Sequence, residues 1–179
     1  NHQFRKVDNK IINQLTGYLE EKLENVIPIV QIDLDKKNKM YGRRYIDQRF
    51  IDDFIRFKAK KNLIDKRMLH GEDILLNVMR ELKIQYDYLT YISVIMHGID
   101  YYLKWFKLVK PKFLIVECYY DMKMQAIYAA KKLGITVIEL QHGIINKRTF
   151  AYYCRKNFSV NPYPDWLLSY GEMSKEEIK

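Results

Sequence analysis

The chain has 179 residues, of which 48% are hydrophobic, 14% aromatic and 30% charged. This composition is typical of a globular protein and the length suffices for one substantial core, so we expect a single α/β domain over residues 1–179. No run of about 18 uncharged apolar residues is present, so no segment is expected to span a membrane as a helix. The sequence begins at Asn1 and its last expected helix has barely begun at Lys179, so we expect a piece of a longer polypeptide.

The net charge limits the classes of binding partner that we expect, and the cysteine content indicates the cellular compartment. The net charge of +9, from 31 basic and 22 acidic residues, favours anionic partners. Phosphates, nucleotide donors, acidic lipids and nucleic acid all qualify, and the charge selects none of them. Cys118 and Cys154 lack metal-ligand spacing, so neither a disulfide scaffold nor a zinc site is expected. We expect a cytoplasmic protein, and peripheral contact with the inner face of the cell membrane stays open.

The first elements expected along the chain are a helix and a strand. Residues 8–25 carry apolar side chains at helical spacing, which predicts an amphipathic helix. Residues 26–34 are strand-like, with Pro28 at the start of the strand or at a sheet edge, because proline cannot donate a ladder hydrogen bond. A polar and basic connection follows from Asp35 to Arg44.

Residues 43–61 form the most basic region and interleave charged with aromatic side chains. The basic residues are Arg43, Arg44, Arg49, Arg56, Lys58, Lys60 and Lys61, and the aromatic ones are Tyr45, Phe50, Phe54 and Phe57. The favoured interpretation is a helix with its aromatic side chains inward and its charges solvated. The alternative is a surface that binds polyanions or a membrane, which the spacing alone cannot establish.

Two more helices are predicted before the first buried strand. One covers about residues 73–83 and a longer one about residues 88–109, which Pro111 closes. The core stripe expected for the longer helix is Leu89, Ile92, Ile95, Met96, Ile99, Leu103 and Phe106. Its other side, with Val94, His97, Tyr101 and Trp105, is also apolar, so we expect another element of the same fold to cover it. The alternative is contact with a partner or with a missing domain.

The segment 113–143 predicts a βαβ unit. Phe113 to Cys118 is an apolar run typical of a strand covered on both faces, which we expect to be central. Asp121 stands at an N-cap position, small residues follow at helical spacing, and Gly134 can end the helix in the left-handed conformation. A second strand covers Ile135 to Leu140.

Both strands of this unit end at the same edge of a parallel sheet, where open α/β sheets bind ligands. We therefore expect residues 117–121 and 141–143 to be neighbours facing one crevice. Trp166 to Tyr170 predicts a third strand ending at the same edge. Ser174 and Glu177 form a capping box, which predicts a helix starting near Lys175.

Among the titratable groups, His142 is the strongest catalytic candidate. Three of the four histidines precede glycine, but only His142 ends a predicted buried strand at the ligand edge, whereas His97 lies mid-helix and His70 in a loop. An imidazole there can accept a proton from an attacking hydroxyl. A structural histidine in a tight turn, which Gly143 would permit, is an equally supported alternative.

Other candidates surround this position. Glu117 and Glu139 interrupt apolar strands, which requires a pairing partner such as Lys110, Lys112 or Arg148, or a functional role. Lys147 and Arg148 could bind a donor phosphate or be solvated. No glycine-rich phosphate loop, Walker sequence, nucleophile elbow or metal cluster is present, which argues against dinucleotide enzymes and P-loop NTPases.

The motif V-I-E-L-Q-H-G-I-I, followed some twenty residues later by P-D-W-L-L-S-Y-G-E, resembles the amino-terminal domain of bacterial capsule-type glycosyltransferases of GT-B architecture. The resemblance covers about the last 70 residues. It implies a Rossmann-like open parallel sheet flanked by helices, forming the acceptor-side half of the enzyme. A donor-binding domain is then expected after residue 179. Teichoic-acid polymerases are similar more distantly, with a histidine-glycine pair at the equivalent strand end.

The resemblance implies that His142 is the base. Substrate contacts are then expected from the surrounding candidates, namely Glu117, Tyr119, Gln141, Gly143, Lys147, Arg148 and Glu172. No cofactor is expected, since a nucleotide-activated sugar is the co-substrate and a saccharide or lipid-linked precursor the acceptor. Gln-His-Gly-Ile replaces the Trp-His-Gly-Thr-like sequence of teichoic-acid enzymes, which favours sugar transfer over polyol-phosphate transfer. A non-catalytic basic module that binds polyanions or a membrane surface is a further alternative, with nucleic acid disfavoured.

Overall fold

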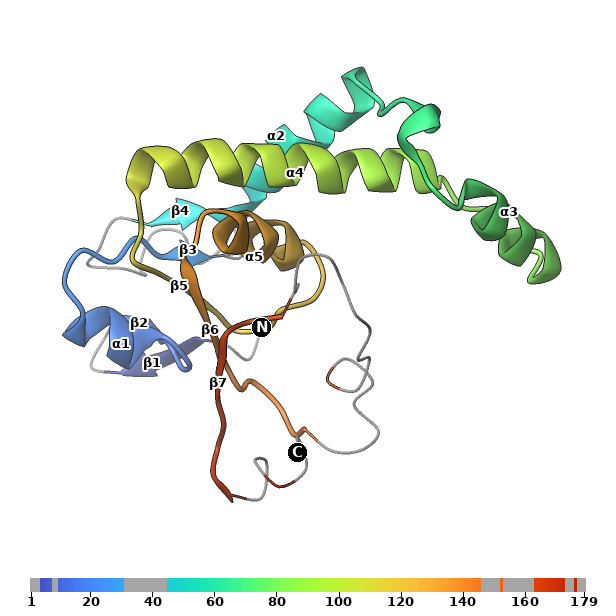
Figure 1. The fold of residues 1–179 in the computed structure, drawn as a ribbon. Helices are drawn as coiled ribbons and strands as arrows, with labels where there is room; N and C mark the ends of the chain where they lie inside the picture. The colour runs from blue at the N-terminus through green and yellow to red at the C-terminus, as the bar shows by residue number, and fades with distance from the viewer. Residues whose placement is uncertain are drawn as a thin grey trace.

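The computed structural model describes residues 4–7, 10–30, 45–145, 152, 163–172 and 176, and shows a mixed α/β fold (Figure 1). Three features that the sequence predicted lie outside these residues. They are the connection 35–44, the basic pair Lys147 and Arg148, and the helix near Lys175. The elements are β1 (Phe4–Val7), β2 (Lys10–Asn13), α1 (Gly17–Lys22), β3 (Ile29–Val30), β4 (Ile46–Asp47), α2 (Gln48–Lys61), the 3-10 helix η2 (Lys66–Met68), α3 (Glu72–Glu81), α4 (Tyr88–Val109), β5 (Phe113–Val116), α5 (Lys123–Lys132), β6 (Thr136–Leu140) and β7 (Trp166–Leu168).

The predicted βαβ unit and its third strand are confirmed. β5, β6 and β7 pair in parallel, with Val116 opposite Glu139 and Leu140 opposite Leu168. The strand order is β5-β6-β7, so the expectation that β5 is central is wrong for the sheet as described. Phe113 at its start is exposed, whereas Val137 in β6 is fully buried. A second small parallel sheet pairs β3 with β4.

The predicted helix over residues 8–25 is wrong in its first half. β1 and β2 pair antiparallel, with Phe4 opposite Asn13 and Val7 opposite Lys10. The side chain of Asn13 then accepts the backbone N–H groups of Leu15 at 2.9 Å and Thr16 at 3.3 Å. These local hydrogen bonds turn the chain between the end of β2 and the start of α1. Apolar residues recur at helical spacing through both elements, so the spacing alone did not reveal the turn.

Helix α2 buries an aliphatic face and leaves its aromatic residues exposed. The Asp47 carboxylate accepts the N–H of Arg49 at 3.1 Å and caps the helix. Ile51, Ile55 and Ala59 are buried in the main core, packed with α4. The expectation that the aromatic side chains point inward is therefore wrong. The smaller aliphatic residues let α2 lie close to α4, and the phenylalanines lie on the solvent side.

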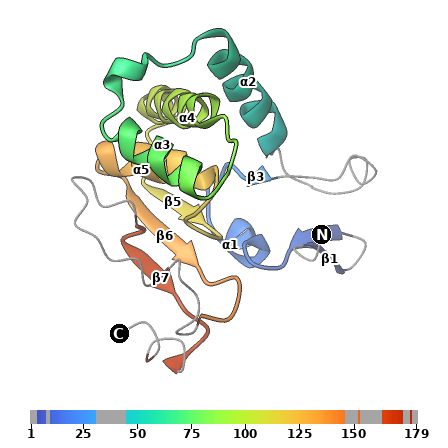
Figure 2. The same ribbon diagram turned by 90° about the vertical axis from the view of Figure 1, so that its right-hand side faces the viewer.

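Helix α4 has the predicted bounds and is covered on two sides. Asp87 caps it by accepting the N–H of Thr90 at 3.0 Å. α2 packs against one side and α5 against another (Figure 2). The buried residues of this helix are Ser93, Val94, Gly98, Tyr102 and Phe106. Of the expected core stripe, Phe106 is buried, Met96 is exposed and the other residues are partly buried, so the stripe is confirmed only in part. The expectation that another element covers the second apolar side is confirmed.

Helix α5 lies against the sheet through small side chains. Ala129, Ala130 and Ile127 are fully buried. Gly134 ends the helix with φ +69, as predicted for a left-handed C-terminal residue. Asp121 is not the N-cap, because Met122 holds that position without a side-chain bond and Asp121 adopts φ 59 before the helix. Among the described residues, no helix is both long and apolar enough to cross a membrane.

Gly98 allows α5 to approach α4 closely. A Cβ atom built at Gly98 would lie 1.6 Å from Oε1 and 2.3 Å from Cδ of Gln125, whose side chain is 1% exposed. Because the amide is enclosed, it cannot swing into solvent. We expect Gly98→Ala to lower the free energy of unfolding by about 1–3 kcal/mol through overpacking, measured by urea denaturation.

The control combines the same change with a shortened neighbour. In a Gln125→Ala background, Gly98→Ala is expected to be neutral or to stabilise by up to about 1 kcal/mol, the helix-propensity gain. Asp100→Ala, at an exposed position of the same helix, should change stability by less than about 0.5 kcal/mol. A stabilising effect of Gly98→Ala in the wild-type background would contradict the close contact.

Candidate active site at the carboxyl edge of the sheet

The carboxyl ends of the parallel strands meet at one edge, as the sequence predicted. Glu117 follows β5, Gln141 and His142 follow β6, and Ser169 and Tyr170 follow β7. The backbone N–H of Gln141 donates to the carbonyl of Leu168 at 3.0 Å, which extends the β6–β7 pairing to this edge. The expectation that residues 117–121 lie beside residues 141–143 is confirmed.

His142 is exposed at this edge and hydrogen-bonded to Tyr120. The Tyr120 Oη lies 2.8 Å from Nε2 of His142, and the two ring centroids are 5.8 Å apart. The bond has two forms: either the hydroxyl donates to Nε2, or an Nε2–H donates to the hydroxyl oxygen. In the second form the lone pair of the neutral imidazole is on Nδ1, so that nitrogen can accept a proton.

Burial raises the pKa of Tyr120, and the neighbouring Cys118, Glu139 and Asp121 add to the shift. The phenol therefore stays protonated at neutral pH, where it can donate or accept a hydrogen bond but cannot act as a phenolate base. Tyr120 is suited to orient the imidazole.

Gln141 joins the two strand ends around His142. Its side chain is 2% exposed, its Nε2 donates to the carbonyl of Gly143 at 2.7 Å, and its Oε1 accepts the N–H of Tyr170 at 2.7 Å. Both ends of the amide are thus used within the protein. A substrate contact by Gln141 stays a prediction, and its observed role is to fix the turn that carries His142.

Gly143 does not have the conformation that its sequence position suggested. Its φ is not in the left-handed region, and an added Cβ would meet no described atom within 4 Å. The turn after β6 therefore does not require glycine for steric reasons. The open space beside it leaves the surface next to His142 uncrowded by described atoms.

Glu117 is paired, but not with the partners that the sequence suggested. Its carboxylate accepts Nδ2 of Asn13 at 2.9 Å and forms an ion pair with Lys123 at 3.3 Å. The Asn13 bond connects the end of β2 to the carboxyl end of β5. The pairing satisfies the charge without a substrate, and a substrate role for Glu117 stays a prediction.

A cluster of tyrosine rings lies beside the edge and is hydrogen-bonded to the buried carboxylate of Glu139 through Tyr152. Tyr119, itself buried, makes edge contacts with the rings of Tyr120, Tyr152 and Tyr163 at centroid distances of 5.8, 5.5 and 5.1 Å. The Tyr152 hydroxyl donates to Glu139 at 2.7 Å. Tyr119 is thus a packing centre, and its predicted substrate contact is untested. Three members of this cluster, Tyr120, Tyr152 and Tyr163, were missed as candidates, although Tyr120 lies within the predicted edge segment.

The remaining candidates are Glu172 and the basic pair Lys147 and Arg148. Glu172 is exposed after β7, following Gly171 with φ +135. Lys147 and Arg148 lie outside the described residues. A hollow of about 440 Å³ lies at the opposite, amino-terminal edge of the sheet, where Lys131 is paired with Asp165 beside Gly134. The His142 edge and this hollow are separated by the length of β6.

Comparison of the chain with protein-family models, with curated proteins and with solved structures finds no match.

The buried carboxylate of Glu139 makes stability depend on pH. Burial raises its pKa, and hydrogen bonds from Tyr152 and the N–H of Tyr119 oppose the shift only in part. Since the folded-state pKa lies above the unfolded one, its contribution is fully present below the unfolded pKa and is lost as pH rises through the folded pKa. We expect Glu139→Gln to match wild type at about pH 4 and to be the more stable protein at pH 7 in urea denaturation.

A second variant tests the cause of this dependence. Tyr152→Phe removes a hydrogen bond that opposes the shift, so the folded-state pKa of Glu139 should rise further. The loss of stability should begin at the same pH as in wild type, because the unfolded pKa is unchanged, but it should continue to higher pH and become larger. A difference between Glu139→Gln and wild type that is the same at every pH would contradict the assignment.

Proposed function

We propose that this chain is the acceptor-side half of a glycosyltransferase of GT-B type, with a Rossmann-like sheet and His142 as the base. The acceptor is a surface polysaccharide or its lipid-linked precursor, and the donor is a nucleotide-activated sugar. The observation that carries the proposal is an exposed imidazole at the carboxyl edge of a parallel sheet, hydrogen-bonded to Tyr120. Ligands of open α/β sheets bind at this edge.

The placement of the two sequence motifs also supports the proposal. The Q-H-G-I segment directly follows β6 and the P-D-W-L-L-S-Y-G-E segment contains β7, so the two motifs that resemble capsule-type glycosyltransferases lie at adjacent strands. The hydrogen bond from the Tyr170 N–H to Gln141 joins one motif directly to the other. Residues of both motifs thus shape one surface.

The proposed step is an inverting displacement. His142 accepts the proton of an acceptor hydroxyl as its oxygen forms a bond to the anomeric carbon of the donor. The bond from that carbon to the phosphate oxygen breaks, and the electron pair leaves with the nucleotide phosphate. Tyr120 holds the ring while the proton moves to Nδ1, the nitrogen with the lone pair when Nε2–H donates to the hydroxyl. Cationic groups near the departing phosphate balance its charge.

The donor-binding surface is proposed to lie on a second domain after residue 179, and the first 179 residues alone are expected to be inactive. Lys147 and Arg148 follow the His142 turn in sequence, and we propose them as contacts for the donor phosphates. Polyol-phosphate transfer is the second candidate reaction. It uses the same imidazole, so turnover with nucleotide-activated sugars against CDP-activated polyols separates the two.

The decisive variant is His142→Ala in the full-length enzyme. Removal of a general base should lower turnover by about 10²- to 10⁴-fold, measured as release of the nucleotide product with acceptor present. His97→Ala and His70→Ala, the other histidines that precede glycine, serve as matched controls and should retain activity. Turnover of His142→Ala within about threefold of wild type would remove His142 from the base role.

Tyr120→Phe tests the positioning of the imidazole. Loss of one side-chain hydrogen bond should lower turnover by about 2- to 10-fold, far less than loss of the base itself. The pH at which turnover reaches half of its maximum should also move, because the hydroxyl contacts the imidazole that we propose as the base. An unchanged pH profile together with unchanged turnover would show that the bond is not used in the reaction.

A further inference from the structure

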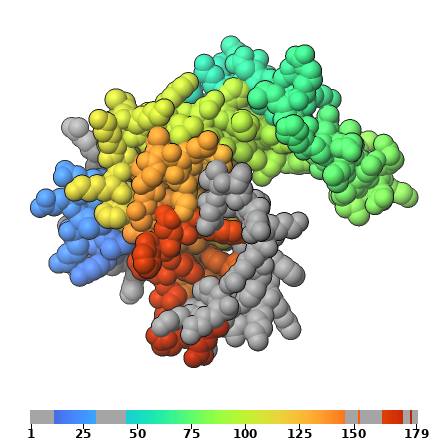
Figure 3. Space-filling model, in the orientation of Figure 1, coloured from blue at the N-terminus to red at the C-terminus, as the bar shows by residue number. Residues whose placement is uncertain are grey.

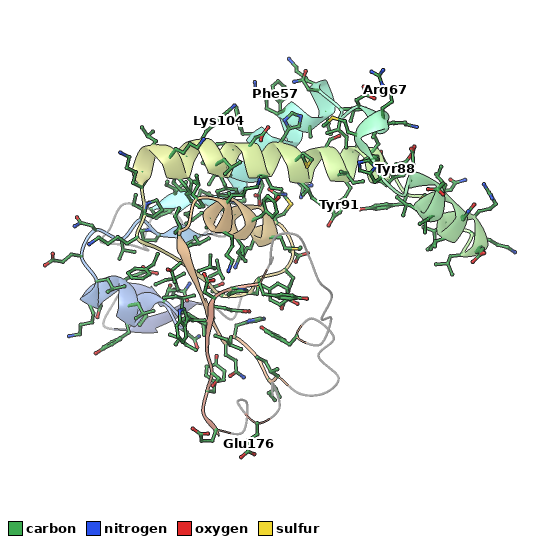
Figure 4. All side chains as sticks on the ribbon, viewed as in Figure 1. Phe57, Arg67, Tyr88, Tyr91, Lys104 and Glu176 are labelled. Atoms are coloured by element: carbon green, nitrogen blue, oxygen red, sulfur yellow. The ribbon has the colours of Figure 1, made fainter. Side chains whose placement is uncertain are left out.

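Helix α2 presents a partly exposed stripe of phenylalanine, of which Phe54 also contacts Tyr101 of α4. At about 100° per residue, Phe50, Phe54 and Phe57 lie within about 60° of one another, and the buried Ile51 and Ile55 lie more than about 90° from the centre of the stripe. Exposed fractions are 69% for Phe50, 48% for Phe54 and 54% for Phe57. Figure 4 shows Phe57 on the side of α2 that is turned away from the sheets. Three large aromatic side chains thus reach solvent from one helix.

Basic side chains accompany this stripe. Lys58 and Lys61 stand over the rings of Phe54 and Phe57, with Nζ 5.7 and 4.5 Å from the ring centroids. On the other flank, helical spacing places Arg56 and Lys60. In all, α2 carries five basic and two acidic residues, and the neighbouring 3-10 helix η2 adds Lys66 and Arg67.

We propose that the aromatic and basic face of α2 binds the surface of a membrane rich in anionic phospholipid. An apolar stripe with cations along its borders is the arrangement of a helix that lies in the interface plane. The rings enter the boundary between headgroups and acyl chains. The lysine ammonium groups remain at the depth of the lipid phosphates, which attract them. This inference does not depend on the transfer reaction.

Comparison with helix α3 shows that the charge of a helix, and not its exposed apolar residues alone, decides whether it suits an anionic membrane. It also exposes apolar residues, including Ile74, Val78 and Leu82, and it projects beyond the amino end of α4 (Figure 3). However, it carries Glu72, Asp73 and Glu81 against a single basic residue, Arg80. An acidic helix is repelled by an anionic surface, so α3 offers no such complementarity. α2 is therefore the helix assigned to the membrane.

Nucleic acid fits this face less well than a bilayer does. A single strand would require a groove that follows the backbone beside the stacking rings, whereas α2 offers a convex helix surface. The Phe54 ring already contacts Tyr101 in a tilted arrangement, with centroids 5.9 Å apart, so it is partly engaged within the fold. A bilayer requires only a shared plane of apolar contact.

The test uses the full-length protein and sedimentation with vesicles. Vesicles of phosphatidylcholine mixed with phosphatidylglycerol should bind the protein, and binding should weaken with added salt, while phosphatidylcholine alone should bind far less. Replacement of Phe50, Phe54 and Phe57 by serine should reduce binding at least about tenfold. Lys58→Glu with Lys61→Glu should reduce it at least about tenfold as well.

Matched control variants test whether vesicle binding depends on this face of α2 rather than on any exposed apolar or basic residues. Serine at Ile74, Val78 and Leu82 removes three exposed apolar residues from α3, and Lys112→Glu with Lys132→Glu reverses two exposed charges on other elements. Both variants should bind vesicles within about twofold of wild type. The substituted phenylalanines are exposed, so urea denaturation should confirm that their serine variant folds.

Three results would overturn the proposal. The first is vesicle binding that the phenylalanine variant retains or that the α3 variant loses equally. The second is binding of single-stranded RNA by the same residues without vesicle binding. The third is a concentration-dependent dimer that the serine substitutions abolish, without vesicle binding, which would make a second copy of the chain the occupant of this face.

Discussion

The side-chain amide of Gln141 constrains the carboxyl edge of the sheet more than any other single group. It accepts from the backbone that follows β7 and donates to the carbonyl of Gly143, and the His142 turn lies between its own backbone and that carbonyl. A buried amide that lost either partner would leave a polar atom unsatisfied, at a cost of about 1–3 kcal/mol. The two strand ends are therefore held in one arrangement, and the position of the imidazole follows from strand pairing.

Helix α4 connects this edge to the rest of the fold. It contacts α5 closely because Gly98 leaves room for the buried side chain of Gln125. On its other side, the hydroxyl of Ser93 accepts the N–H of Ile64 at 3.0 Å and donates to the carbonyl of Leu89 at 2.6 Å, which fixes the chain after α2. A change in the packing of α4 would thus reach both α2 and the helix that covers the sheet.

The spacing of apolar residues predicted an element correctly where a single helix or strand accounted for the whole apolar series. The bounds of α4 and the βαβ unit followed from apolar spacing and from Gly134, and these placed His142 at the correct edge. Spacing failed at residues 8–25, where β2 and a short helix share one apolar series. It also failed to identify the partners of Glu117, because Asn13 lies 104 residues away in sequence. Long-range polar pairing of this kind leaves no periodic signal.

The two proposed surfaces lie on different sides of the molecule, and this bears on the acceptor. In Figures 1 and 2, α2 lies above the three-stranded sheet, and the carboxyl ends of β6 and β7 point away from it. With α2 on a bilayer, the edge that carries His142 faces away from the lipid. Under the two proposals, an acceptor held close to the bilayer would have to reach around the molecule to this edge, whereas the end of a growing polysaccharide would extend from the surface. Taken together, the two proposals are therefore more compatible with the polymer than with a short lipid-linked precursor as the proposed acceptor.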